Sequence, residues 1–310
     1  MIKKNIIKNN LSSHKVRELK GIISPPPDKS ISHRALLFSA LAMGKSTIVN
    51  LLHSEDVLNM VKALKALGVN IIKRSNIYYV IGVGLNGFNT PSKHIDCGNS
   101  GTLARILLGA IGGSEIIATL VGDLSLSSRP MDRVINPLKK MGISFNSINN
   151  KLPLIVRGAS DILPIKYISP ISSAQVKTTI LLAGLNSKGT SEIIEPYSSR
   201  NHSENLLKHY GADIKYDTKK SGKNSVLITG GAVLKSCNII VPGDNQIPPY
   251  LSRIWAPNKS TRYLRQYCDC EFIIIGNCGR YLHIFSGVNI TNFIPLRQDF
   301  SIINVHILRK

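Results

Sequence analysis

Acidic residues are scarce in this sequence, and their scarcity sets its charge. The 310 residues include 18 Asp and Glu against 39 Lys and Arg, which gives a formal net charge of +21. Charged residues make up only 18% of the chain, so the excess comes from missing acids and not from abundant bases. Such a chain favours anionic partners, namely phosphorylated metabolites, nucleic acids or acidic membrane surfaces. The positions of the cations must decide among them.

Long apolar runs are also missing. The first 21 residues contain no apolar core of the roughly 7–15 residues that a secretory signal needs, and no run approaches the ~18 apolar residues of a membrane span. The five cysteines are scattered and odd in number, which favours free thiols in a reducing compartment. We therefore expect a cytoplasmic protein with no membrane partner.

Aromatic residues are few, at 6% of the chain, and metal motifs are absent. A nucleic-acid binder usually combines clustered Lys and Arg with aromatic side chains on one face, so we expect no nucleic-acid partner. The segment "CDCEFIIIGNC" at 268–278 matches no common zinc spacing. We expect ordinary thiols there, with neither a metal nor an organic cofactor in the protein.

Three stretches of the chain follow one plan, which indicates an internal repeat. Each has a polar opening, an apolar helix, a glycine, a β-branched strand, a polar turn and an amphipathic helix that ends at a glycine. Chance similarity of three amphipathic units is the ordinary alternative, but the matched order argues against it. The openings lie 70 and 72 residues apart and the closing glycines 74 and 69 apart, at Ser30, Ser100 and Ser172 and at Gly68, Gly142 and Gly211.

Apolar periodicity predicts the elements of each unit. Val57, Met60, Leu64 and Leu67 recur at helical spacing, and a glycine after such a helix suits the left-handed conformation of a C-terminus. The segments 76–84 and 151–158 are typical of strands. Each unit is therefore predicted to be βαβαββ. The fold class is α/β (α+β), with one domain of three repeated units over residues 22–240.

The three apolar helices begin where phosphate groups bind well. A helix N-terminus presents unpaired N–H groups and a partial positive charge. In the first unit Lys29, Ser30 and Arg34 stand there, although Ser30 and Ser32 could be ordinary helix caps. In the second unit "GNSGT" at 98–102 offers backbone N–H groups, followed by Arg105.

The third unit repeats this arrangement with neutral donors. Ser172, Ser173 and Gln175 open its helix, and Lys177 follows. Arg129 stands where a further helix is predicted to start, with Pro130 at a favoured first-turn position. Arg is well suited to bidentate contacts with phosphate or carboxylate.

One phosphate-binding motif is excluded. "GKST" at 44–47 looks like the end of a P-loop, but the position five residues before Gly44 is Ser39 and not glycine. The motif also follows a helix instead of preceding one. We therefore do not predict nucleotide binding at this position.

Eight stretches together resemble the EPSP synthase (3-phosphoshikimate 1-carboxyvinyltransferase) family, in family order over residues ~20–244. They are "PPDKSISHRALL", "NLLHSEDV", "CGNSGTLARILLG", "SLSSRPMDRVINPLKKMG", "LPLIVRG", "SAQVKTTILLAGL", "EPYSSRNHSENLLKHYGA" and "VPGD". The resemblance implies a shikimate-pathway transferase that leads to chorismate and the aromatic amino acids. It moves the enolpyruvyl group of phosphoenolpyruvate to the 5-hydroxyl of shikimate 3-phosphate and releases phosphate, without a cofactor.

The resemblance also implies roles for individual residues. Lys29, Ser30 and Arg34 would hold shikimate 3-phosphate, with Lys29 also near phosphoenolpyruvate. Ser173, Ala174, Gln175 and Arg200 would complete the shikimate phosphate site. Gly101 and Arg129 would bind phosphoenolpyruvate, in a loop shaped by Asn99 and Thr102.

The resemblance stops at Asp244. Family members carry their acid and base groups on a second domain, and residues 245–310 contain none of the expected motifs. We predict that residues 1–21 belong to an incomplete second domain and that residues 241–310 are a remnant or a non-homologous tail, produced by a shifted reading frame or by divergence. The catalytic residues are therefore unassigned, and the activity of this chain is expected to be low or absent.

Two functions from different classes follow. The first is the transferase, impaired by truncation, and the alternative is a non-catalytic domain that binds shikimate 3-phosphate. Both predict small phosphorylated molecules as partners, and we expect a monomer.

Overall fold

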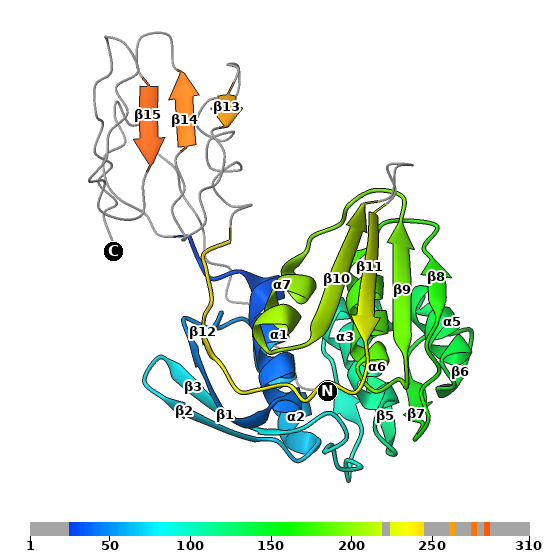
Figure 1. Cartoon of the computed structure of the whole chain (residues 1–310). Helices are drawn as coiled ribbons and strands as arrows, with labels where there is room; N and C mark the ends of the chain where they lie inside the picture. Colours follow the sequence, from blue (N-terminus) through cyan, green and yellow to red (C-terminus); the bar gives the residue numbers. More distant parts are fainter. Residues whose placement is uncertain (1–24, 219–223, 245–260, 264–273, 278–281, 286–310) are drawn as a thin grey trace. The chain divides into compact units, whose positions relative to one another are not determined.

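The computed structural model describes residues 25–218 and 224–244, together with the short segments 261–263, 274–277 and 282–285 (Figure 1). The chain divides into two compact units, of which residues 26–242 form one and residues 1–25 with 243–310 form the other. Predictions for residues 1–21, and for most of the chain after Asp244, lie outside the described residues. The described part of the smaller unit includes an antiparallel sheet of β13 (Thr261–Tyr263), β14 (Ile274–Asn277) and β15 (Leu282–Phe285).

Residues 26–242 contain three four-stranded sheets with the same topology. In the spatial order of each sheet, the first edge strand is parallel to its neighbour, and the other neighbouring pairs are antiparallel. This confirms the predicted three-fold repeat and the α/β class. The strand orders are β12 (Asn238–Ile240), β1 (Met43–Val49), β3 (Ile77–Val83), β2 (Asn70–Arg74); β4 (Ile95–Asp96), β5 (Ile117–Val121), β7 (Leu154–Arg157), β6 (Ser144–Ser147); and β8 (Lys166–Ile168), β9 (Thr190–Glu195), β11 (Asn224–Thr229), β10 (Asp213–Thr218).

The edge strand of the first unit comes from the end of the third. β1 pairs in parallel with β12, so that Thr47 lies opposite Asn238 (Figure 1). The Asp28 N–H also donates to the Pro242 carbonyl at 2.8 Å. A βαβαββ order within each continuous unit is therefore wrong for the first one, which begins with its helix and is completed by residues 238–240.

Among the described residues, six longer helices and one short helix accompany the sheets. In each unit an apolar helix is followed by an amphipathic one, and these pairs are α1 and α2, α3 and α5, and α6 and α7. The bounds are α1 (Lys29–Leu41), α2 (Glu55–Ala66), α3 (Gly101–Gly112), α4 (Leu124–Ser128), α5 (Asp132–Lys140), α6 (Ala174–Gly184) and α7 (His202–His209).

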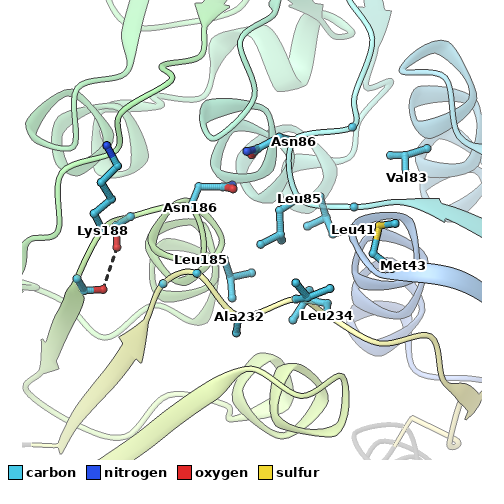
Figure 2. Close-up of a pocket in the computed structure, with 17 residues that line it drawn as sticks. Leu41, Met43, Val83, Leu85, Asn86, Leu185, Asn186, Lys188, Ala232 and Leu234 are labelled. Carbon is cyan, nitrogen blue, oxygen red and sulfur yellow. Dashed lines mark hydrogen bonds between the residues drawn. The ribbon is translucent and has the colours of Figure 1, made fainter.

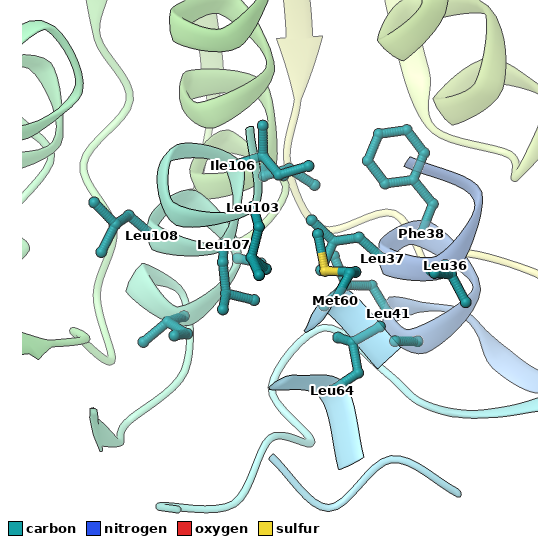
Figure 3. Close-up of a cluster of buried hydrophobic side chains, with 14 of the residues drawn as sticks. Leu36, Leu37, Phe38, Leu41, Met60, Leu64, Leu103, Ile106, Leu107 and Leu108 are labelled. Atoms are coloured by element: carbon teal, nitrogen blue, oxygen red, sulfur yellow. The ribbon is translucent and has the colours of Figure 1, made fainter. Parts of the chain in front are cut away.

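The apolar helices form the centre of the core. All residues of α1 from Ser32 to Leu41 are buried, as expected for a helix that is apolar on nearly every side. Leu37 of α1, Met60 of α2 and Leu103 of α3 lie in one cluster (Figure 3). Truncating such a side chain to Ala typically costs about 2–5 kcal/mol, so this packing fixes how the helix starts lie relative to one another.

A glycine in the left-handed backbone conformation follows the amphipathic helix of each repeat. Gly68, Gly142 and Gly211, predicted at the ends of the amphipathic helices, have φ of +92°, +97° and +91°, which confirms the left-handed conformation. A second set of glycines, missed by the sequence analysis, lies at the ends of β3, β7 and β11. A Cβ there would lie about 2 Å from the carbonyl oxygen of a residue one to three positions after the apolar helix of the same unit, in the pairs Gly82 with Ala42, Gly158 with Ser114 and Gly230 with Ser187.

The helix caps decide one open alternative and correct one prediction. Asp28 caps α1, since its side chain accepts from the Ile31 N–H at 2.7 Å, and Ser30 and Ser32 lie inside the first turn. Arg129 does not open a helix: it is the C-cap of α4, and α5 begins at Asp132. The predicted start was shifted because Pro130 is also compatible with the bend between two helices.

Within the described residues, every helix falls short of the length and hydropathy that a membrane crossing requires.

Candidate anion-binding site

A pocket of about 270 Å³ lies where the starts of α1, α3 and α6 meet the start of α7. Seven of its nine lining residues are predicted site residues, and no carboxylate is among the nine. Two arginines without a competing acid make the pocket suited to an anion. The lining residues are Ser30, Arg34, Thr102, Ser173, Ala174, Gln175, Ser199, Arg200 and His202.

Arg34 is the buried cation of this pocket. Only 3% of it is exposed, and its Nε donates to the Ser203 hydroxyl at 2.6 Å while Nη2 donates to Thr178 at 3.0 Å. Its Nη1 donates to the Ser30 carbonyl at 3.0 Å. Burial lowers the pKa of Arg34 to about 10, partly offset by the negative charges of Glu204 and Asp28. A bound anion would restore the stabilisation that burial removes from this cation.

Gln175 joins the second and third helix starts. Its Nε2 donates to the Thr102 hydroxyl at 3.0 Å, and its Oε1 accepts from Arg105 Nη1 at 3.1 Å. The Thr179 hydroxyl donates to the Arg105 carbonyl at 3.0 Å. These hydrogen bonds connect helices α3 and α6, and they therefore set the distance between the two helices at this side of the pocket.

Asn99, Gly101 and Arg129 form a second group beside the pocket. Arg129 Nη2 donates to Asn99 Oδ1 at 2.5 Å, and Asn99 Nδ2 donates to Asp123 Oδ2 at 2.7 Å. A Cβ on Gly101 would lie 2.8 Å from Arg105 Nη1 and 3.4 Å from Arg129 Nη1. A side chain at this position would therefore crowd Arg105 and contact Arg129, and glycine leaves the space beside both guanidinium groups open.

The second group lies in a positive field. Burial lowers the pKa of Arg105, and the nearby charges of Arg129 and Arg133 lower it further. Three arginines close enough to affect one another favour a bound anion near the start of α3.

Lys29 lies in neither group. Its ammonium pairs with Asp56 of α2 at 2.9 Å, and its side chain is 52% exposed. The structure therefore does not bring this predicted site residue into the pocket lining, although the side chain is exposed and its ion pair is of the weak, solvated kind.

Lys177, which the sequence places at the third helix start, points away from the pocket. Its side chain is 3% exposed and pairs with Glu195 at 3.0 Å and with Glu204 at 2.7 Å. This cation neutralises buried carboxylates and is not a candidate ligand.

A second, larger pocket lies at the opposite ends of α1 and α6, away from the helix starts (Figure 2). Its volume is about 670 Å³, and its lining from Leu41, Met43 and the segments 83–87, 185–189 and 230–234 is mainly apolar. Its one lining cation, Lys188, pairs with Asp161 at 3.1 Å. Size alone would select this pocket, but the charges that a phosphorylated ligand needs are at the smaller one.

No group of three or more His, Cys, Asp or Glu side chains in the described part of the chain could hold a metal ion. Cys97 and Cys237 are free thiols there, while the "CDCEFIIIGNC" segment lies largely outside the described residues.

Comparison with known proteins places the chain in a family. The family model of EPSP synthase (3-phosphoshikimate 1-carboxyvinyltransferase) matches residues 13–247. The chain belongs to the EPSP synthase family. It is 46% identical over 228 residues to the 3-phosphoshikimate 1-carboxyvinyltransferase of Novosphingobium aromaticivorans. The matched region covers 73% of this chain and 52% of that protein.

Further members of the EPSP synthase family show the same partial match. The Zymomonas mobilis protein of the same name is 44% identical over 243 residues. The matched region covers 78% of this chain and 53% of the Zymomonas protein. The structure of EPSP synthase from Acinetobacter baumannii superposes with a TM-score of 0.69 at 35% identity, covering 76% of this chain and 52% of that one. The chain thus spans about half the length of the relatives it matches.

Three residues of the site escaped the sequence analysis. Ser199 and His202 line the pocket, and Asp123 anchors Asn99. Ser199 and His202 stand in the quoted stretch "EPYSSRNHSENLLKHYGA", so the signal was present. The sequence alone did not show that this loop and the start of α7 pack against the start of α6.

Proposed function

We propose that this chain binds shikimate 3-phosphate in the pocket between the helix starts, as the substrate-holding part of an enolpyruvyl transferase. The observation that carries the proposal is the buried Arg34 in an acid-free lining with Ser30, Ser173 and Gln175. A phosphate there would receive hydrogen bonds from hydroxyls, an amide and Arg200, and it would neutralise a cation that burial disfavours.

The proposed reaction joins shikimate 3-phosphate to phosphoenolpyruvate. The 5-hydroxyl oxygen bonds to the central carbon of phosphoenolpyruvate, and the hydroxyl proton is removed. In the addition step the methylene carbon takes up a proton. In the elimination step the same carbon loses a proton while the bond between the central carbon and the phosphate oxygen breaks. Products are 5-enolpyruvylshikimate 3-phosphate and inorganic phosphate. Cations stabilise the charges, and acid and base groups must move both protons.

Phosphoenolpyruvate would bind at the second group. Arg129 is positioned by Asn99 and stands beside Gly101, where no side chain blocks it. Arg105 and Arg133 add positive charge nearby. Lys29 could turn from Asp56 to the ligand, since an exposed ion pair is held by roughly 1 kcal/mol or less.

Turnover by this chain alone is proposed to be slow or absent. No carboxylate lines the pocket, and the nearby Asp123 accepts a hydrogen bond from Asn99. A general base must lie within hydrogen-bond reach of the proton it removes, and the described lining offers none of the carboxylate type. The chain would then hold the substrate without completing the reaction.

Calorimetry with shikimate 3-phosphate tests the binding step. We expect saturable heat for the wild type and a loss of at least tenfold in affinity for Arg34→Met. Lys188→Met at the larger pocket removes one positive charge without touching the proposed site and should bind as the wild type does. Absence of heat and of a thermal shift in the wild type would refute the proposal.

Phosphate release separates the transferase from a non-catalytic binding domain. With both substrates present, we expect binding but little or no phosphate release. Rapid release that depends on both substrates would show that this chain is a complete catalyst and would overturn the proposed impairment.

We further propose a monomer in the cytoplasm with small phosphorylated molecules as its partners. Size-exclusion chromatography with light scattering checks the first part, where a mass near 33.9 kDa is expected. Salt-dependent binding to random DNA would contradict the last part.

A further inference from the structure

Two buried carboxylates share one buried lysine directly behind the proposed site. Lys177 Nζ lies 3.0 Å from Glu195 and 2.7 Å from Glu204, and the three side chains are 3%, 3% and 1% exposed. Buried charges are costly unless they are paired and hydrogen-bonded. A triad of this kind therefore needs a reason other than stability alone.

Glu195 connects two walls of the pocket. Its Oε1 accepts from the Ser173 backbone N–H at 2.9 Å, at the cap of α6. Both of its oxygens accept from the Ser199 hydroxyl, at 2.9 and 2.8 Å. Ser199 precedes Arg200, and Ser173, Ser199 and Arg200 all line the pocket. One carboxylate thus holds the start of α6 against the loop that carries Arg200.

Glu204 connects the same triad to Arg34. It follows Ser203, which accepts from Arg34 Nε, and its negative charge raises the pKa of Arg34 against the effect of burial. Glu204 Oε2 is buried without a hydrogen-bond partner among the described residues. A buried, unsatisfied carboxylate oxygen is rare in folded proteins. The other oxygen, Oε1, pairs with Lys177 at 2.7 Å, and the charge of Glu204 also acts on Arg34.

We propose that Lys177, Glu195 and Glu204 are positioning residues that set the width of the anion pocket without touching the ligand. The inference rests on the proposed function of that pocket. Positive and negative charges alternate from Arg34 through Glu204 and Lys177 to Glu195. Arg34, at one end of this series, lines the pocket, and Glu195, at the other end, holds Ser173 and Ser199, which line it. Moving any member displaces Ser173, Ser199 or Arg34 from the distance at which one phosphate group reaches all three.

The sharpest test shortens Glu195 while keeping its charge. Glu195→Asp retracts the carboxylate from Ser173, Ser199 and Lys177, but the field at the pocket stays nearly the same. Glu192→Asp is the matched control, on the same strand β9, where Glu192 pairs with exposed Lys166 at 2.9 Å. We expect the Kd for inorganic phosphate and for shikimate 3-phosphate to rise tenfold or more in Glu195→Asp and to stay within twofold in Glu192→Asp. Equal Kd values in both variants would overturn the inference.

Backbone exchange in the ligand-free protein separates this inference from the proposed function. The Ser173 amide should exchange at least tenfold faster in Glu195→Asp than in the wild type or in Glu192→Asp, while amides in the middle of α3 should not change. If the wild type binds neither anion, the proposed function fails, and the Ser173 exchange rate still decides the positioning role. An unchanged rate would refute it.

A second variant covers the case in which Glu195→Asp does not fold. Ser199→Ala removes one half-buried hydroxyl from an otherwise exposed loop and leaves the ion pairs of Lys177 intact. We expect phosphate affinity to fall at least threefold, with no change in the Ser173 exchange rate. Wild-type affinity in Ser199→Ala would show that the link from Glu195 to the Arg200 loop has no effect on the pocket.

Discussion

His33 Nε2 lies 3.2 Å from the Ser100 hydroxyl, and this contact joins the starts of α1 and α3. The other ring nitrogen lies 2.8 Å from the Lys29 carbonyl, which can only accept. Nδ1 therefore carries the proton, and Nε2 accepts from Ser100. Ser100 is also the N-cap of α3, so one neutral histidine fixes the first turn of α1 to the cap of α3.

The burial of His33 predicts a loss of stability in acid. Burial lowers the pKa of His33 from its ordinary 6.5, opposed by the Lys29 carbonyl and by Asp56. The unfolded chain then binds the proton more readily than the folded one, so the free energy of unfolding falls as the pH drops below about 6.5. The slope from this residue is at most about 1.4 kcal/mol per pH unit.

Urea unfolding between pH 8 and pH 5 measures this slope. His33→Gln should flatten the curve below pH 6.5, while the exposed His53→Gln should leave it unchanged. An identical slope in the wild type and in His33→Gln would rule out the assignment.

Arg34→Lys should fail to replace the arginine. One ammonium cannot reach the Ser30 carbonyl, Thr178 and Ser203 together, so buried oxygen atoms lose their donors. We expect a destabilisation of about 1–3 kcal/mol, together with at least tenfold weaker phosphate binding. The same exchange at half-buried Arg129 should cost less than about 1 kcal/mol. Thermal unfolding of the two variants side by side makes the comparison.

Asp56→Asn should release Lys29. The pair is exposed, with side-chain exposures of 52% and 24%, so its loss should change the free energy of unfolding by no more than about 1 kcal/mol. Because Asp56 no longer competes for the ammonium, anion affinity should increase a few-fold. Calorimetry with shikimate 3-phosphate and phosphoenolpyruvate checks this, and weaker binding of both would contradict the role given to Lys29.

Two glycine substitutions separate steric crowding from backbone strain. In Gly158→Ala the new Cβ would lie 1.9 Å from the Ser114 carbonyl oxygen, so the strand must move off α3, at about 3 kcal/mol or more. In Gly211→Ala nothing lies within 4 Å, but φ is +91°, so only the left-handed conformation is penalised, by about 1–2 kcal/mol. Chemical denaturation should rank the wild type above Gly211→Ala and Gly211→Ala above Gly158→Ala.

The sequence was sufficient for features with local causes. The closing glycines, the strands at 77–83 and 154–157 and the apolar helices follow from periodicity and from backbone preferences within a few residues. The cap of α1 shows the limit, since Asp28, Ser30 and Ser32 are all acceptable caps by type. Only the packing of the first turn selects Asp28.

Features that depend on residues distant in the sequence could not be predicted from local patterns. Lys177 and Arg34 are both cations near helix starts, yet one is enclosed by Glu195 and Glu204 and the other faces the pocket. Which of these occurs depends on where β9 and α7 place their carboxylates, and no local pattern encodes that. The edge strand β12 is a similar case, because three residues are too few to reveal their partner strand.

The pairing of β1 with β12 also has a consequence for the order of events during synthesis. Thr47 and Asn238 are 191 residues apart, so the first repeat leaves the ribosome with an open strand edge that the chain cannot cover until the third repeat has been made. An uncovered edge is the usual starting point for pairing with another chain. The second and third repeats, whose edge strands precede their helices, are complete as soon as they emerge. Nascent chains halted before residue 238 should therefore depend on chaperones more strongly than chains halted a few residues after Pro242.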